Sequence, residues 1–202
     1  MSESSAAKTP MSVEEATTAV QLAVEEQEQL TPDDYDKVLA TLSSHHDDPA
    51  AQYYLGELFM RLSAAKMFHT AITCYRRANQ SRHDPALGRI GLIQSGLMDG
   101  TPADLVSEGG ALRALHAAAS EGVRDAADGL MKLSRKLSDE YDHLFLELRF
   151  GEESGKSSEE LAAMQERLED LGILLEEDGA MRRERSARRL TNPADEAVKE
   201  TA

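Results

Sequence analysis

Four consecutive residues, His45 to Asp48, carry the side chains best suited to metal chemistry in this sequence. Imidazole and carboxylate groups ligate metal ions, so such a run could hold a divalent cation. Adjacent residues on a helix point about 100° apart, however, and no second cluster of ligands accompanies this one. We therefore expect a solvated turn between two helices at residues 45–48 and predict no metal site.

Cys74 is the only cysteine, and His69 stands five residues before it. Such a pair could supply a thiol nucleophile and its base. Residues five apart do not share a face of a helix, so we expect Cys74 to be a small packing residue between helices instead. The sequence also has no phosphate-binding loop, dinucleotide fingerprint or serine elbow. It therefore predicts a protein that is not an enzyme and has no cofactor.

An arginine cluster, "RRERSARR", covers residues 182–189 with five arginines and one glutamate. Because it lacks interleaved aromatic side chains on which bases could stack, we do not expect it to bind nucleic acid. Two other interpretations stay open. The cluster binds a small anion, or it binds the protein's own acidic surface.

The chain of 202 residues carries a net charge of −15, and this charge is unevenly distributed. Residues 1–60 and 121–180 each have a net charge of −10, whereas residues 61–120 have a net charge of +3. The acidic flanks repel nucleic acid and anionic membranes. The weakly basic middle is either an ordinary solvated surface or a basic groove for an acidic partner.

The first twenty residues lack the basic start and apolar stretch of a secretory signal, and their acidity disfavours a mitochondrial presequence. No run of about 18 apolar residues could cross a bilayer. A single cysteine allows no intramolecular disulfide. We therefore expect a cytoplasmic protein that binds neither nucleic acid nor membranes.

Helices must position these side chains, because good helix formers are abundant and aromatic residues make up only 4% of the chain. Two helices have related sequences: "DPAAQYYLGELF" begins at Asp48, and "DPALGRIGLIQS" begins at Asp84. Both open with Asp-Pro, which is typical of a helix start. The pair Leu55-Gly56 aligns with Ile90-Gly91 at an offset of 35. A glycine inside each helix predicts a neighbour that packs too closely for a side chain.

The helices that follow also correspond. "AITCYRRANQ" from Ala71 matches "ALRALHAAAS" from Ala111 at an offset of 40, which places Tyr75 opposite Leu115. A further segment, "AADGLMKLSRKL" from Ala126, resembles the first helix again without a glycine at the matching position. Two helices in each unit of 36 to 40 residues form an internal repeat, and stacked units share a continuous core.

This pattern resembles Sel1-like repeats, which are close relatives of tetratricopeptide repeats. The matching residues of the clearest unit are Ala51, Leu55, Gly56, Phe59, Ala71, Tyr75, Ala78 and Pro85. The second unit keeps Ile90, Gly91, Ala111, Leu115 and Ala118 but has no aromatic residue where Tyr75 stands. The resemblance covers residues 34–137. It implies an all-α fold, a short right-handed superhelical array of antiparallel helix pairs with N- and C-terminal capping helices.

A single helical-repeat domain is therefore expected over residues 11–178. Its units are a degenerate first one at 12–47, two clear ones at 48–83 and 84–123, a third at 124–150 and a capping helix at 157–178. Residues 1–10 are expected to be disordered, and residues 179–202 to be a basic helix end followed by a disordered tail. Ser12 and Glu15 have the spacing of a capping box at the start of the domain.

Helical-repeat arrays bind a partner peptide or helix on the surface formed by the first helix of each unit. On those helices we expect the positions outside the apolar stripe to face the partner. These predicted binding residues are Tyr53, Tyr54, Glu57, Arg61, Arg89, Leu92, Ser95, Asp128, Lys132 and Arg135. One of the two tyrosines is expected to pack on the preceding helix. Arg61 and Arg89 face the groove or, alternatively, pair with carboxylates of neighbouring units.

The sequence thus predicts a non-catalytic scaffold or adaptor that binds another protein. The bound peptide or helix is expected to be acidic or amphipathic. One alternative is a dedicated cytoplasmic chaperone or immunity protein for a single bacterial secreted effector. A more distant alternative is an enzyme with an unrecognised site.

Overall fold

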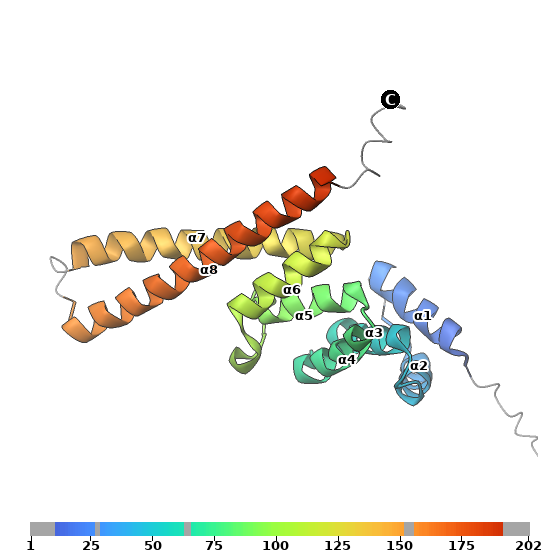
Figure 1. Cartoon of the computed structure of the whole chain (residues 1–202). Helices are drawn as coiled ribbons and strands as arrows, with labels where there is room; N and C mark the ends of the chain where they lie inside the picture. Colours follow the sequence, from blue (N-terminus) through green and yellow to red (C-terminus); the bar gives the residue numbers. More distant parts are fainter. Residues whose placement is uncertain (1–10, 27–28, 63–65, 152–155, 192–202) are drawn as a thin grey trace, which may run out of the picture.

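The structure is a computed structural model that describes residues 11–26, 29–62, 66–151 and 156–191. Within these ranges the regular structure is all helical and contains no strand, which confirms the all-α prediction (Figure 1). In chain order the helices are α1 (Val13–Glu26), α2 (Pro32–Ser44), α3 (Pro49–Glu57), a π-helical turn η1 (Leu58–Leu62), α4 (Phe68–Gln80), α5 (Asp84–Gln94), a 3-10 turn η2 (Ala103–Leu105), α6 (Glu108–Ser120), α7 (Arg124–Gly151) and α8 (Ser158–Thr191). The predicted disordered segments, 1–10 and 192–202, lie outside the described residues.

Reciprocal hydrogen bonds at the start of α1 confirm the predicted capping box. The Ser12 amide donates to Glu15 Oε2 over 2.8 Å, and the Glu15 amide donates to Ser12 Oγ over 3.2 Å. A second box, which the sequence analysis did not identify, begins α8, where Ser157 and Glu160 exchange the same two bonds. Each box satisfies backbone donors that a helix start leaves free.

The two Asp-Pro segments begin their helices differently. Asp48 is the N-cap of α3, and its carboxylate accepts from the amides of Ala50 and Ala51. Asp84 already lies in the first turn of α5, where the N-cap is His83 and makes no side-chain cap bond. The shared sequence therefore marks the same helix start within one residue, but only Asp48 caps its helix.

Consecutive helices pack against each other along the chain, and α1 also contacts α3 as α5 contacts α7. Their apolar side chains form three clusters that follow one another: one among α1 to α4, one between α4 and α5, and one among α6, α7 and α8. The alanines that the repeat alignment matches are fully buried, namely Ala51, Ala71, Ala78, Ala86, Ala111, Ala118 and Ala126.

Both repeat glycines lie where helices meet, as predicted. A methyl group added to Gly56 of α3 would stand 2.5 Å from Cε1 of Tyr75 in α4. A methyl group added to Gly91 of α5 would stand 2.7 Å from Cγ of Leu115 in α6. Both distances are too short for a side chain, so each glycine permits the close contact of its helix pair.

The third unit departs from the prediction in one way. It has no glycine at the position that matches Gly91, as expected, because Met131 stands there. Gly129 lies two residues earlier, and a methyl group there would collide with Leu92 of α5. The unit expected over 124–150 is one continuous helix of 28 residues rather than a helix pair. Because no glycine or proline stands between Leu137 and Phe150, nothing in the sequence ends the helix earlier.

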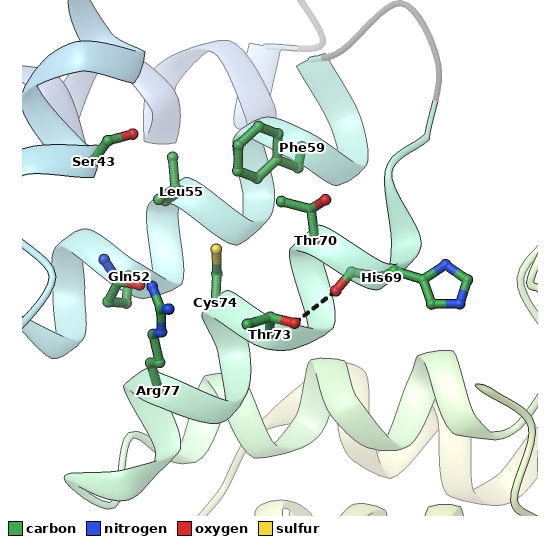
Figure 2. A pocket seen from close by; sticks show the side chains of 9 residues that line it. All are labelled: Ser43, Gln52, Leu55, Phe59, His69, Thr70, Thr73, Cys74 and Arg77. Atoms are coloured by element: carbon green, nitrogen blue, oxygen red, sulfur yellow. Dashed lines mark hydrogen bonds between the residues drawn. The ribbon is translucent and has the colours of Figure 1, made fainter.

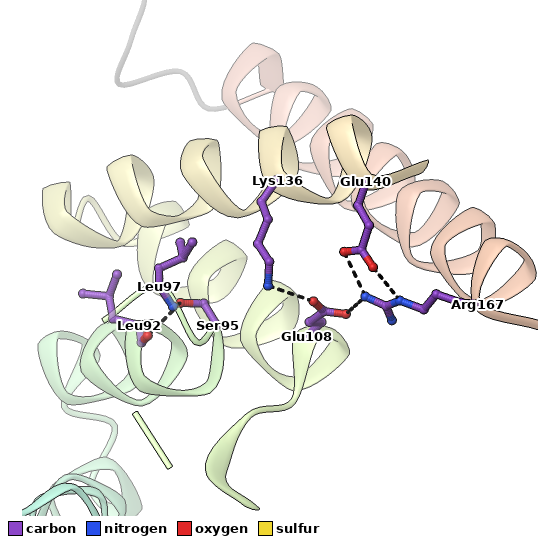
Figure 3. Close-up of polar contacts among 7 residues, drawn as sticks. All are labelled: Leu92, Ser95, Leu97, Glu108, Lys136, Glu140 and Arg167. Carbon is purple, nitrogen blue, oxygen red and sulfur yellow. Dashed lines mark hydrogen bonds and ion pairs between the residues drawn. The ribbon is translucent and has the colours of Figure 1, made fainter. Parts of the chain in front are cut away.

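Helix α8 lies beside α7, and the two extend past the shorter helices (Figure 1). It continues to Thr191, so the segment after residue 178 that was predicted as a basic helix end is part of α8. A charged network fixes it to its neighbours: Arg167 of α8 pairs with Glu108 of α6 at 2.9 Å and with Glu140 of α7 at 2.8 Å, while Lys136 of α7 reaches Glu108 at 3.2 Å (Figure 3). Among the described helices, none has both the length and the hydropathy needed to span a lipid bilayer.

Candidate functional site

The predicted binding residues divide into an exposed, a half-buried and a buried group. The exposed members are Arg61, Asp128, Lys132 and Arg135, and the half-buried ones are Tyr53, Tyr54, Arg89 and Leu92. Glu57 and Ser95 are 2% and 0% exposed. The expectation that these two side chains lie on an open groove surface is therefore wrong.

Glu57 is buried because three donors surround its carboxylate. The Tyr75 hydroxyl donates to Oε1 over 2.8 Å, Arg89 Nε donates to the same oxygen over 2.6 Å, and Arg61 Nε pairs with Oε2 at 2.9 Å. Arg89 also reaches forward to Asp125 of α7 at 2.9 Å. The network therefore connects α3, α4, α5 and α7, and Arg89 pairs with carboxylates of neighbouring units rather than with solvent.

Burial and neighbouring charges shift the pKa values of two groups in this network, Arg89 and Tyr75. Burial alone would lower the pKa of the Arg89 guanidinium, but the charge and hydrogen bond of Glu57 outweigh it and raise that pKa. Burial raises the pKa of the Tyr75 hydroxyl well above its usual value, and the nearby Glu57 carboxylate raises it further. Tyr75 therefore stays a hydrogen-bond donor and Arg89 stays charged, which keeps the contacts intact.

Ser95 and Leu92 have structural roles at the end of α5. The Ser95 hydroxyl donates to the Leu92 carbonyl over 2.7 Å and accepts from the Leu97 amide over 3.2 Å, which ends the helix (Figure 3). The Leu92 side chain packs onto Gly129 of α7. Ser95 therefore ends α5, and Leu92 holds this helix to α7.

One of the two adjacent tyrosines, Tyr54, contacts an earlier helix. The Tyr54 hydroxyl donates to Gln21 of α1 over 3.2 Å, so Tyr54 packs on a preceding helix. Tyr53 has its ring 5.9 Å from that of Tyr75 and 4.9 Å from that of His83. Both rings stay half-buried, so each still presents one edge to solvent.

Asp128, Lys132 and Arg135 remain an open row on α7. Their spacing of four and three residues places them on one face of the helix. Each is exposed, and none of the three side chains makes a hydrogen bond or ion pair with another described residue. This row is the part of the predicted surface that is free to contact another molecule, whereas Arg61 is exposed but pairs with Glu57.

Cys74 lies in a core cluster and is 5% exposed, which confirms the predicted packing role. Burial raises the pKa of its thiol, so the protonated, less reactive form is favoured. His69 bonds Asp104 at 2.8 Å rather than Cys74. Across the described ranges, no three histidine, cysteine or acidic side chains come together as metal ligands, and this includes the turn at residues 45–48.

A buried polar cluster that the sequence analysis missed joins α6, α7 and α8. His116 Nε2 lies 2.7 Å from Asp178 Oδ1, and Ser134 Oγ and Arg182 Nε each donate to Asp178 Oδ2 over 2.9 Å. Burial alone would raise the pKa of Asp178, but the bonds from His116, Ser134 and Arg182 outweigh it and lower that pKa. A hydrolytic triad needs the histidine between serine and aspartate. Here the aspartate stands in the middle, so the cluster clamps helices together.

The arginine cluster at 182–189 binds carboxylates of its own helix at two positions. Arg182 pairs with Asp178 at 2.9 Å, and Arg188 bonds Glu184 over 2.6 Å. For these two arginines the structure favours contact with the protein's own acidic residues.

Comparison of the chain with family models, curated proteins and solved structures gives no match.

Two buried polar residues could have been noticed in the sequence. Gln52 stands in "DPAAQYYLG" beside an alanine of the apolar stripe, and His116 stands among alanines in "ALRALHAAAS". A polar residue on an otherwise apolar helix face is the available signal. His116 contacts Asp178 of α8, which is 62 positions away in the chain. The periodicity of a single helix does not predict such a contact.

Proposed function

We propose that this chain is a non-catalytic scaffold or adaptor that binds a segment of another protein. In this proposal the helix pairs form a short right-handed superhelical array similar to Sel1-like repeats, closed at its ends by α1 and α8. One observation carries it: Gly56 packs on Tyr75, and the aligned Gly91 packs on the aligned Leu115. Matched contacts at matched positions support stacked repeats, and stacked repeats expose a continuous binding surface.

The surface proposed for the partner consists of the exposed residues on the first helices. It combines half-buried Tyr53 on α3 and Arg61 on η1 with Asp128, Lys132 and Arg135 on α7. The Glu57 network lies beneath it and holds these helices together. A surface that is already rigid loses less conformational entropy when a partner binds. We place this activity in the cytoplasm, where a single buried thiol stays reduced.

The proposal is tested by capture of partners on the full-length tagged chain from its native host, followed by mass spectrometry. Several stoichiometric partners support an adaptor. One stoichiometric partner supports a dedicated chaperone or immunity protein instead. If nothing is captured and the purified protein carries a cofactor or turns over a substrate, the enzyme alternative holds.

A matched pair of variants tests the proposed surface. Arg135→Glu reverses a charge in the row on α7, and Arg149→Glu makes the same change near the other end of the same helix. Both side chains are exposed, so both variants should fold normally. We expect Arg135→Glu to weaken capture of the partner at least fivefold and Arg149→Glu to leave it unchanged. Equal capture by the two variants would reject this surface.

A further inference from the structure

An open cleft lies between the end of α2, the helix α3 and one face of α4, away from the Glu57 network (Figure 2). Its volume is about 410 Å³. The residues that line it are Ser43, Gln52, Leu55, Phe59, His69, Thr70, Thr73, Cys74 and Arg77. Apolar side chains from α3, η1 and α4 thus lie beside hydroxyl, amide and guanidinium groups.

Gln52 supplies a buried acceptor with no partner. Its side chain is 1% exposed, and its Nε2 donates to the His45 carbonyl over 3.4 Å. That bond fixes which end of the amide faces the carbonyl, because a carbonyl oxygen accepts and does not donate. Oε1 is left without a hydrogen bond to any described residue. A buried acceptor without a donor destabilises the protein, and an N–H group from a ligand would remove that cost.

Arg77 supplies an unpaired cation at the same place. Figure 2 shows its side chain extending from α4 toward Gln52 on α3. Its guanidinium is exposed and makes no ion pair with a described carboxylate, although the chain has a net charge of −15. Arg61 and Arg89, the arginines first expected to meet a partner, are both paired with Glu57. Arg77 is therefore an unpaired cation at the edge of the cleft.

The dimensions of the cleft suit a short extended chain. The α4 residues that line it run from His69 to Arg77, a rise of about 12 Å at 1.5 Å per residue. Three or four extended residues cover that length. Leu55, Phe59 and the thiol side of Cys74 provide an apolar floor on which one small side chain can rest.

We propose that this cleft binds an extended segment of a protein partner, about four residues long, that carries a carboxylate side chain. The carboxylate pairs with Arg77, and one backbone N–H of the segment donates to Gln52 Oε1, which is buried in the cleft wall and must turn toward the cleft to accept that bond. The proposal rests on the interaction function above and assigns the chemistry of the partner. It also moves the acidic contact from the Arg61 and Arg89 region to the opposite face of α3 and α4.

The test uses a random library of acetylated, amidated hexapeptides selected on the immobilised full-length protein. We expect the selected peptides to carry aspartate or glutamate at one fixed position. Replacing that residue by asparagine or glutamine should weaken binding at least tenfold. N-methylation of the peptide backbone should abolish binding at a single nitrogen, the one that donates to Gln52. In nitrogen-15 spectra, the side-chain amide signals of Gln52 should move when the peptide binds.

Neighbouring arginines provide a matched control. Arg77→Glu should weaken the selected peptides at least tenfold, whereas Arg76→Glu, one residue away and also exposed, should change affinity less than twofold. Thermal melts establish that both variants are folded. Failure to select any peptide, selection without an acidic residue, or equal binding to the Arg77→Glu variant overturns the cleft assignment. If a native partner co-purifies equally with Arg77→Glu, the interaction function stands and only this site fails.

Discussion

The predicted units at 48–83 and 84–123 both pack a glycine of one helix on a side chain of the next but contact the following unit by different chemistry. Glu57 of the first unit and Leu92 of the second follow the aligned glycines. Glu57 bonds Arg89 of α5, whereas Leu92 packs onto Gly129 of α7. The same position therefore holds neighbouring units together through a buried ion pair in one case and through apolar packing in the other.

The side chain opposite each glycine explains this difference. Tyr75 places a hydroxyl inside the core of the first unit, and a buried hydroxyl needs a hydrogen-bond partner. Glu57 accepts that bond, and its charge in turn requires the arginines that surround it. Leu115 at the matching position has no polar side-chain atom and needs no hydrogen-bond partner. The apolar Leu92 can therefore stand where the first unit has Glu57. One residue type in the second helix thus decides whether the junction is polar or apolar.

The largest expected effect comes from removing the charge of Glu57. Glu57→Gln leaves Arg89 partly buried without its main counterion, and we expect a loss of about 3 kcal/mol in the free energy of unfolding. Urea denaturation measures it. The triple variant Glu57→Leu, Arg89→Leu and Tyr75→Phe should recover at least half of that loss, because neither a charge nor an unpaired hydroxyl stays buried. A Glu57→Gln protein as stable as the parent would contradict the polar junction.

Leu92→Ala tests the apolar junction in the same assay. The substitution opens a cavity above Gly129, and we expect a loss of about 2 kcal/mol because Leu92 is half-buried. Leu146→Ala on the exposed end of α7 is the control and should cost less than about 0.5 kcal/mol. If the two losses are equal, Leu92 does not hold the units together.

Gly56→Ala tests the crossing that both units share. The added methyl group meets the ring of Tyr75, which its bond to Glu57 holds in place, so we expect a loss of about 1–2 kcal/mol. Gly179→Ala in α8 meets only the flexible end of Arg183 and should raise stability slightly, since alanine favours a helix. Opposite signs in thermal melts are the expected result. A stabilising Gly56→Ala would refute the close contact at that position.

The smallest effect concerns Asp178, the buried carboxylate of the last unit. Its folded-state pKa is lowered from the usual 3.8, so its stabilisation is complete above that value and is lost as the pH falls below it. Asp178→Asn should therefore reduce stability at neutral pH and make the acid limb of the stability–pH curve less steep. Parallel curves for the two proteins, recorded by urea denaturation at several pH values, would show that Asp178 is not held in its charged form by the cluster.

The sequence alone determined the helical class, several helix starts and the places where two pairs of helices meet. Each of these depends on local chemistry: the capping box at Ser12, the first-turn prolines, and glycines at fixed offsets in apolar stripes. A helix start or an apolar stripe involves residues within a few turns of each other, so periodicity and capping rules suffice.

Only the tertiary structure decided which polar side chains are buried. Glu57 and Ser95 lie outside the apolar stripe by sequence, yet contacts with residues on other helices or beyond the helix end cover them. His116 meets Asp178 across 62 positions of the chain, and the cleft at Gln52 needs three helices to form its walls. A polar group can be buried wherever a distant partner satisfies it. Because the pattern within one helix carries no information about that partner, these sites emerged only when the helices were assembled.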